Sequence, residues 1–263
     1  MAKETQLEEV RWDRMTAPQL RTLARRKTVV IIPLGATEQH GQHLPTQVDW
    51  RLAYEIAQRA ARQMVGGQRA IVTPAIPFGM SEHHMSLGGT ITLNYATMAA
   101  VVGCVVRSAA RHGFKRIFVL NGHGGNIAAL ETIITELTVE LQLPLAAGTY
   151  WQIAAESIAG ILEQQKQVLH ACEAETAMLQ ALSPETVLPL KKSYRAPLVP
   201  GLSAIAGVNP GVYRWQQLQT RSKQGLIGEA WAATPEKGLR LLEAISTDVA
   251  QALSNQTLWT API

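Results

Sequence analysis

The chain has 263 residues, of which 47% are hydrophobic and 17% are charged. This balance is typical of a soluble globular enzyme and argues against intrinsic disorder. The formal net charge of +4 comes mostly from scattered basic residues. The one basic run, 21–27, is interpreted as a solvated helix face. Because no basic stripe is interleaved with aromatic residues, we expect no nucleic-acid partner.

The two cysteines, Cys104 and Cys172, are too few for a disulfide framework and fit a reducing compartment. The first residues carry no hydrophobic signal core. The longest strongly apolar run, 99–106, is too short to span a bilayer. We therefore expect a cytoplasmic protein that has no membrane partner.

Strands and helices are predicted to alternate along most of the chain. The predicted strands are 28–34, 70–76, 115–120 and 145–151. The predicted helices are 16–27, 50–64, 95–112, 127–142, 152–165, 170–182 and 235–253. Beyond Pro184 the pattern loosens into a loop rich in proline and glycine over 196–211. This order predicts one domain over 1–263, with an α/β fold and a largely parallel central sheet.

Three of the loops that follow predicted strands carry chemically active side chains. They contain the segments 38–49 and 82–84 and the residue His123. In open α/β sheets, ligands bind where the carboxyl ends of the strands bring such loops together. The sequence therefore predicts that these loops form a single active site.

The first of these loops has the composition of a divalent metal site. Glu38 and His40 point the same way if the backbone is extended, and carboxylates and imidazoles are ligands for divalent transition metals. Asp49 is either a further ligand or the N-cap of the next helix, and it could serve as both. His43 is interpreted as a pocket residue.

The next two loops leave alternatives open. The segment 121–126, Asn-Gly-His-Gly-Gly-Asn, could be a glycine loop that holds a phosphate at a helix N-terminus. A histidine between glycines is interpreted instead as a presented ligand or base. His84 could bind a metal, but we favour a role in lining the pocket.

A third set of candidates opens the helix near residue 170. His170 and Glu173 are three residues apart and share a helix face. Glu173 is the favoured ligand because a second ion needs a carboxylate. Glu175 could simply complement the helix dipole. Cys172 is an alternative nucleophile, although its acidic neighbours oppose a thiolate.

These motifs resemble the creatininase (creatinine amidohydrolase) family. The resemblance is carried by Pro-Leu-Gly-Ala-Thr-Glu-Gln-His-Gly-x-His-Leu-Pro from residue 33, by segment 121–126, and by His-Ala-x-Glu-x-Glu-Thr from residue 170. It implies a three-layer α/β/α fold, a mostly parallel sheet and two divalent metal ions, commonly zinc, manganese or iron. The family also implies a homo-oligomer, with hexamers as one form.

By position, the resemblance implies metal binding by Glu38, His40, Asp49 and His123, with Asp49 as the bridge. Creatininase has a further carboxylate where this chain has Gly125, so we assign that role to Glu173. This departure argues against creatinine as the substrate. Family members with the glycine version include pyrimidine deformylases, a peptidase of redox-cofactor maturation and hydrolases of cyclic carbon skeletons.

We therefore expect a metal-dependent amidohydrolase that cleaves a C–N bond in a small substrate through a metal-bound hydroxide. His170 or Glu175 would protonate the leaving nitrogen. The candidate substrate contacts are His43, Trp50, His84, Tyr150 and Trp151. The alternatives are a hydrolase acting on a peptide or on a C–C bond, a metal-free amidase that uses Cys172, and a non-catalytic homologue that binds small molecules.

Overall fold

The computed structural model describes residues 9–64, 68–190 and 214–261. Its centre is a sheet of four parallel strands, in the order β2-β1-β3-β4. They are β1 (Val29–Leu34), β2 (Ala70–Val72), β3 (Arg116–Asn121) and β4 (Leu145–Thr149). The prediction of an α/β fold with a parallel sheet is confirmed. The loop predicted at 196–211 lies outside the described residues.

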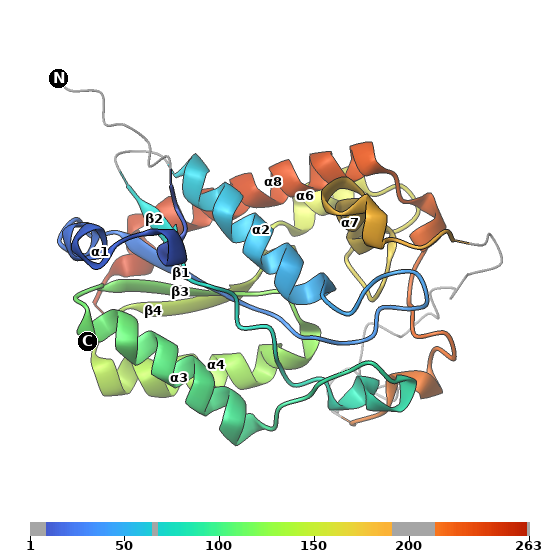
Figure 1. The fold of residues 1–263 in the computed structure, drawn as a ribbon, viewed down its shortest axis with the longest axis horizontal. Helices are drawn as coiled ribbons and strands as arrows, with labels where there is room; N and C mark the ends of the chain where they lie inside the picture. Colours follow the sequence, from blue (N-terminus) through green and yellow to red (C-terminus); the bar gives the residue numbers. More distant parts are fainter. Residues whose placement is uncertain (1–8, 65–67, 191–213, 262–263) are drawn as a thin grey trace.

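The helices cover both faces of the sheet, which makes three layers (Figure 1). One face carries α3 (Tyr95–Arg111) and α4 (Ile127–Leu141). The other carries α2, α6, α7 and α8. Their bounds are Val48–Gln63, Ala155–Ile161, Glu173–Leu182 and Pro235–Ser254. The remaining helices of the described chain with α geometry are α1 (Ala17–Ala24) and α5 (Tyr150–Ile153).

The sheet has a hydrophobic core on each of its two faces, and the alternating side chains of β1 contribute to both. Every residue of this strand is buried, as expected for a strand covered on both faces. Val29 and Ile31 pack with the apolar faces of α2 and α8, whereas Val30 and Ile32 pack with those of α3 and α4. Successive side chains of a strand point to opposite faces, so one short apolar run supports both layers.

The order of the strands in the sheet indicates where a ligand would bind. From β1 the chain adds β2 on one side and then crosses back to add β3 on the other side. The reversal lies between β1 and β3, where Leu34 pairs with Asn121. Ligands of open α/β sheets bind outside the carboxyl ends of strands at such a reversal. The loops that follow β1 and β3 are those with the candidate ligands.

Several boundaries differ from the sequence-based prediction. The strand predicted to reach residue 76 ends at Val72, because Pro74 has no N–H to donate to the ladder. The strand predicted to reach 151 ends at Thr149 and turns into α5. The helix predicted from 170 begins at Glu173, since Ala171 has a φ of 51°.

Asp49 is not a helix N-cap, because α2 starts at Val48 with Gln47 as its N-cap. Its side chain therefore stays available for the cluster described below. Two glycines let the strand ends approach this turn of α2. A Cβ on Gly35 would lie 2.3 Å from the Trp50 nitrogen, and one on Gly122 would lie 2.5 Å from the Asp49 carbonyl oxygen. No helix of the described residues is long and apolar enough to cross a membrane.

Candidate metal centre

Side chains from four parts of the fold meet at the carboxyl ends of β1 and β3. Glu38 and His40 come from the loop after β1, Asp49 from the first turn of α2, and His123 directly follows β3. Glu175 reaches them from the first turn of α7. All five residues are at most 3% exposed. Burial of so many ionisable groups is costly unless they pair or bind metal.

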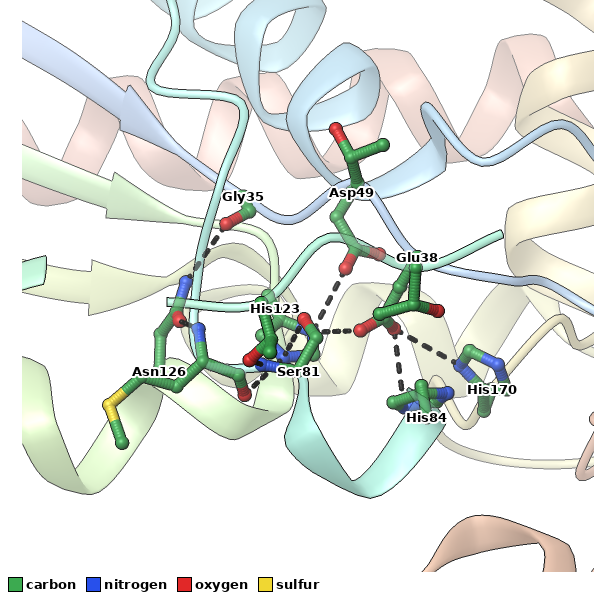
Figure 2. Close-up of polar contacts among 12 residues, drawn as sticks. Gly35, Glu38, Asp49, Ser81, His84, His123, Asn126 and His170 are labelled. Carbon is green, nitrogen blue, oxygen red and sulfur yellow. Dashed lines mark hydrogen bonds and ion pairs between the residues drawn. The ribbon is translucent and has the colours of Figure 1, made fainter. Parts of the chain in front are cut away.

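The first group of potential ligands is Glu38, Asp49 and His123. His123 Nδ1 lies 3.2 Å from Glu38 Oε2 and 2.9 Å from Asp49 Oδ2. Figure 2 shows Glu38 between His123 on one side and His84 and His170 on the other. One nitrogen and two carboxylate oxygens thus face a common point.

The second group is His40, Asp49 and Glu175. His40 Nε2 lies 3.1 Å from Asp49 Oδ1 and 3.7 Å from Glu175 Oε1. The other Glu175 oxygen, Oε2, accepts a hydrogen bond from the Cys172 N–H at 3.3 Å. Glu175 therefore caps its own helix with one oxygen and presents the other to His40.

Asp49 belongs to both groups and gives one oxygen to each. Three atoms of the cluster, Glu38 Oε2, His40 Nε2 and Asp49 Oδ2, are buried without a hydrogen-bond partner among the described residues. Such atoms are rare in folded proteins unless another group satisfies them. Imidazole nitrogens and carboxylate oxygens gathered in this way are a donor set that fits divalent transition metals.

Hydrogen bonds around the cluster fix the tautomers of its two imidazoles. His40 Nδ1 donates to the Glu38 carbonyl oxygen at 3.2 Å. His123 Nε2 donates to the Met80 carbonyl oxygen at 3.1 Å. In each ring the remaining nitrogen, which faces the carboxylates, is then free to offer a lone pair. Second-sphere bonds of this type orient histidine ligands in metal sites.

The segment 121–126 is built to hold His123. The Asn121 side chain accepts from the His123 N–H and donates to the His123 carbonyl. Asn126 ties this loop to the Gly35 carbonyl and to the Met80 N–H. The alternative of a phosphate loop is not favoured, because the tight contacts of Gly125 are with protein atoms: a Cβ there would lie 2.2 Å from the Met80 carbonyl oxygen.

The electrostatics of the cluster show how strongly it attracts positive charge. Burial opposes a charge on His123, but the negative charges of Glu38 and Asp49 directly beside its Nδ1 outweigh it and raise the pKa of His123 to about 10. The pKa of His40 is raised for the same reason, against the same effect of burial, by Asp49 and Glu175. Both shifts show that the carboxylates favour a positive charge beside them.

Glu173, the carboxylate predicted to bind the second ion, is not brought to the cluster. Its oxygens face Lys237 Nζ, at 2.5 Å, and the backbone N–H groups of Glu163 and Gln164. The carboxylate that lies beside His40 is that of Glu175, which was predicted as a proton donor. The structure therefore places Glu175, and not Glu173, beside His40, because residues two apart on a helix point in different directions.

His170 lies beside the cluster, as the sequence predicts. Its Nδ1 is 3.6 Å from Glu38 Oε1, and it forms a third group of potential ligands with Glu38 and His40. With a side-chain exposure of 15%, it is the least buried residue of the three groups. His84 Nε2 lies 3.4 Å from the same oxygen, with its ring against that of His170. Gln39 was missed by the sequence analysis. Its Nε2 lies 2.8 Å from His84 Nδ1 and 3.0 Å from His170 Nε2. The sequence signal that could have identified it is its position between Glu38 and His40.

The remaining predicted contacts lie around this centre. His43 is buried and its Nε2 bonds to Thr176 Oγ1 at 2.9 Å, so it supports α7. Tyr150 is fully buried, and its hydroxyl has no hydrogen-bond partner among the described residues. Trp151 packs edge-on against Tyr150, and Trp50 is partly buried next to Asp49. Their contacts with substrate stay predictions.

Cys172 does not have the environment of a nucleophile. It is fully buried at the start of α7, and burial together with the charge of Glu175 raises the pKa of its thiol to about 12. Iodoacetamide at pH 8 is therefore expected to modify the exposed Cys104 and to leave Cys172 unmodified in the native protein. Peptide mass mapping measures both sites. Rapid loss of activity in step with Cys172 labelling would restore the thiol mechanism.

The fold has three layers, with a parallel sheet between two layers of helices. Buried carboxylates and imidazoles lie at its strand ends, so this is an α/β protein with a candidate metal centre. The family model Creatininase, described as creatinine amidohydrolase, matches residues 13–253. The chain therefore belongs to the creatininase family, whose members with known activity are hydrolases, and it is an amidohydrolase of that family. This agrees with the resemblance found in the sequence.

Relatives with assigned functions differ in substrate. A mycofactocin precursor peptide peptidase of Mycobacterium ulcerans (strain Agy99) is 31% identical over 87% of this chain and 85% of its own. The creatinine amidohydrolase of Pseudomonas putida is 24% identical over 97% of this chain and 98% of its own. The family therefore includes enzymes named for peptides and for a small cyclic molecule.

Solved structures show the same fold. A crystal structure of creatinine amidohydrolase has a TM-score of 0.76 at 24% identity and covers 94% of this chain and 97% of its own. Two further creatininase structures are a manganese form, with a TM-score of 0.75 and 24% identity, and a mutant zinc–zinc form, with a TM-score of 0.72 and 23% identity. They cover 93% and 94% of this chain and 97% of their own in both cases.

Proposed function

We propose that this protein is a dinuclear metal-dependent amidohydrolase that cleaves an amide-type C–N bond. The observation that carries the proposal is the pair of three-residue groups that share Asp49. Glu38 and His123 would hold one ion, His40 and Glu175 the other, and Asp49 would bridge them. The metals named for related structures favour zinc or manganese.

Two divalent ions in these groups would polarise a carbonyl and lower the pKa of a bound water from about 15.7 towards 7. The chain's own residues supply the rest. His40 and His123 are already oriented by backbone carbonyls, so binding costs little reorganisation. His170 would pass a proton to the leaving nitrogen, because its Nδ1 faces the cluster from the least buried side.

The substrate is proposed to be either a small amide or a peptide. The peptide class is favoured by the 31% identity to a peptide peptidase over most of the chain. At Gly125 the surrounding atoms leave no room for a side chain, so the carboxylate expected at this position from the resemblance to creatininase has no counterpart here. Both substrate classes contain the same bond, so the metal chemistry does not depend on this choice.

The test combines metal analysis with a hydrolysis screen. Purified protein is expected to contain up to two equivalents of zinc or manganese and to hydrolyse at least one compound in a panel of lactams, formamides, creatinine and short peptides. Chelation and dialysis should abolish that activity, and readdition of the metal should restore it. Full activity in the metal-free protein, or no metal binding at all, would contradict the proposal.

A further inference from the structure

Lys237 and Glu173 form an ion pair inside the protein that takes no direct part in the cluster. Lys237, in the first turn of α8, is 5% exposed, and Glu173, the first residue of α7, is fully buried. Lys237 Nζ lies 2.5 Å from Glu173 Oε1 and also donates to the Ala232 carbonyl oxygen at 2.8 Å. A buried ion pair contributes little net stability to the fold, because desolvation offsets the attraction between the charges. We therefore ask which groups this pair positions.

Glu173 connects three segments of the chain. Besides Lys237, its carboxylate accepts hydrogen bonds from the backbone N–H groups of Glu163 and Gln164, both at 3.3 Å. These two residues lie in the turn after α6. The first turns of α7 and α8 and the turn after α6 therefore converge on one carboxylate.

The two helices also touch directly beside the ion pair. A Cβ on Gly238, the residue after Lys237, would lie 1.9 Å from the Ala177 carbonyl oxygen of α7. Ala177 lies one helical turn after Glu173. Glycine thus permits close backbone contact of α8 with α7, and the ion pair fixes the same contact electrostatically.

This contact sets the position of Glu175. Glu175 is in the same first turn of α7 as Glu173, and its Oε1 lies 3.7 Å from His40 Nε2. A metal ligand must be held within about 0.5 Å of its productive place by the groups behind it. The candidate groups behind this turn are the Glu173–Lys237 pair and the bond from Thr176 to His43.

We propose that Lys237 is a positioning residue, which holds the first turn of α7 through Glu173 so that Glu175 can bind the second ion. The inference rests on the proposed function, since that ion is the one it serves. The ion held by Glu38, Asp49 and His123 does not depend on α7. The pair therefore acts on one of the two ions.

Lys237→Met tests this by removing the cation while keeping the apolar stem. In cobalt titrations of the metal-free protein, the first equivalent should bind as in wild type and the second about tenfold or more weakly. Lys237→Arg should restore much of the second affinity. If Lys237→Met binds both equivalents as tightly as wild type, the proposal is wrong.

Cys172 supplies a readout that needs neither metal nor substrate. It is the N-cap of α7 and fully buried, whereas Cys104 on α3 is exposed. In metal-free Lys237→Met, alkylation of Cys172 should be faster by about tenfold or more, with Cys104 unchanged. Burial is the main cause of the raised pKa of the Cys172 thiol, so faster reaction reports loosening of the turn. Protection equal to wild type would overturn the proposal.

Two further variants separate positioning from general destabilisation. Leu253→Ala removes a fully buried side chain near the other end of α8 and should leave the second ion and Cys172 as in wild type. The double variant of Glu173→Gln with Lys237→Met leaves no unpaired charge, and it replaces Lys237→Met if that protein does not fold. If wild type binds two ions but hydrolyses nothing, the proposed activity fails while these measurements still decide the role of Lys237.

Discussion

Asp49→Asn is expected to lose both metal ions and to lower kcat/KM by ~10³-fold or more. Asp49 gives one oxygen to His123 and the other to His40, so each group of ligands depends on it. An asparagine removes the negative charge and turns an NH₂ group towards one of the two imidazoles. Loss of about 4 kcal/mol of transition-state stabilisation corresponds to this change in rate.

The measurement is metal content by plasma mass spectrometry, together with kinetics on the best substrate of the screen. Asp13→Asn provides a matched control, because Asp13 is an exposed carboxylate that pairs with Arg11 away from the cluster. It should keep two ions and full activity. Two tightly bound ions in folded Asp49→Asn would show that Asp49 is not the bridge.

Glu175→Gln is expected to lose one ion only and to lower kcat by ~10²-fold. The glutamine oxygen can still accept the Cys172 N–H, so the start of α7 should stay capped. Its NH₂ group would face His40 Nε2 in place of a carboxylate oxygen. The group formed by Glu38, Asp49 and His123 is unchanged, so the first equivalent should bind normally. Loss of about 2.7 kcal/mol gives this rate change.

Cobalt absorption spectra recorded during a titration distinguish one bound ion from two. Glu156→Gln, an exposed position in the first turn of α6, is the control for the same chemical change and should behave as wild type. A Glu175→Gln protein with no bound ion would mean that the two sites are not separable. A Glu175→Gln protein that binds two ions would show that Glu175 is not a metal ligand.

The origin of the carboxylate beside His40 also bears on the proposed substrate. The contacts of Gly125 leave no space for a side chain, so this position of the loop after β3 supplies no carboxylate. The carboxylate beside His40 comes instead from α7. The chain is 31% identical to a peptide peptidase and 24% identical to a creatinine amidohydrolase, so both substrate classes stay in the proposal.

Local sequence was sufficient for most of the sheet and for part of the site. The runs that became β1 and β3 are apolar and end in polar, glycine-containing loops, so their ends and the candidate ligands beside them could be predicted from pattern alone. Glu38, His40 and His123 lie within a few residues of those ends, where chain geometry leaves little choice. The convergence of their loops followed from the rule for parallel sheets.

The tertiary structure decided which glutamate of α7 faces the cluster. Glu173 and Glu175 are both in the first turn, about 200° apart around the helix, and sequence periodicity does not fix the rotation of so short a helix. That rotation is set by Lys237 and Gly238 of α8, which are far away in sequence. The tautomer of His123 likewise depends on the Met80 carbonyl, which lies 43 residues away in the sequence. The sequence by itself therefore determined the kinds of ligand and the loops that carry them, whereas long-range packing decided which oxygen and nitrogen atoms meet.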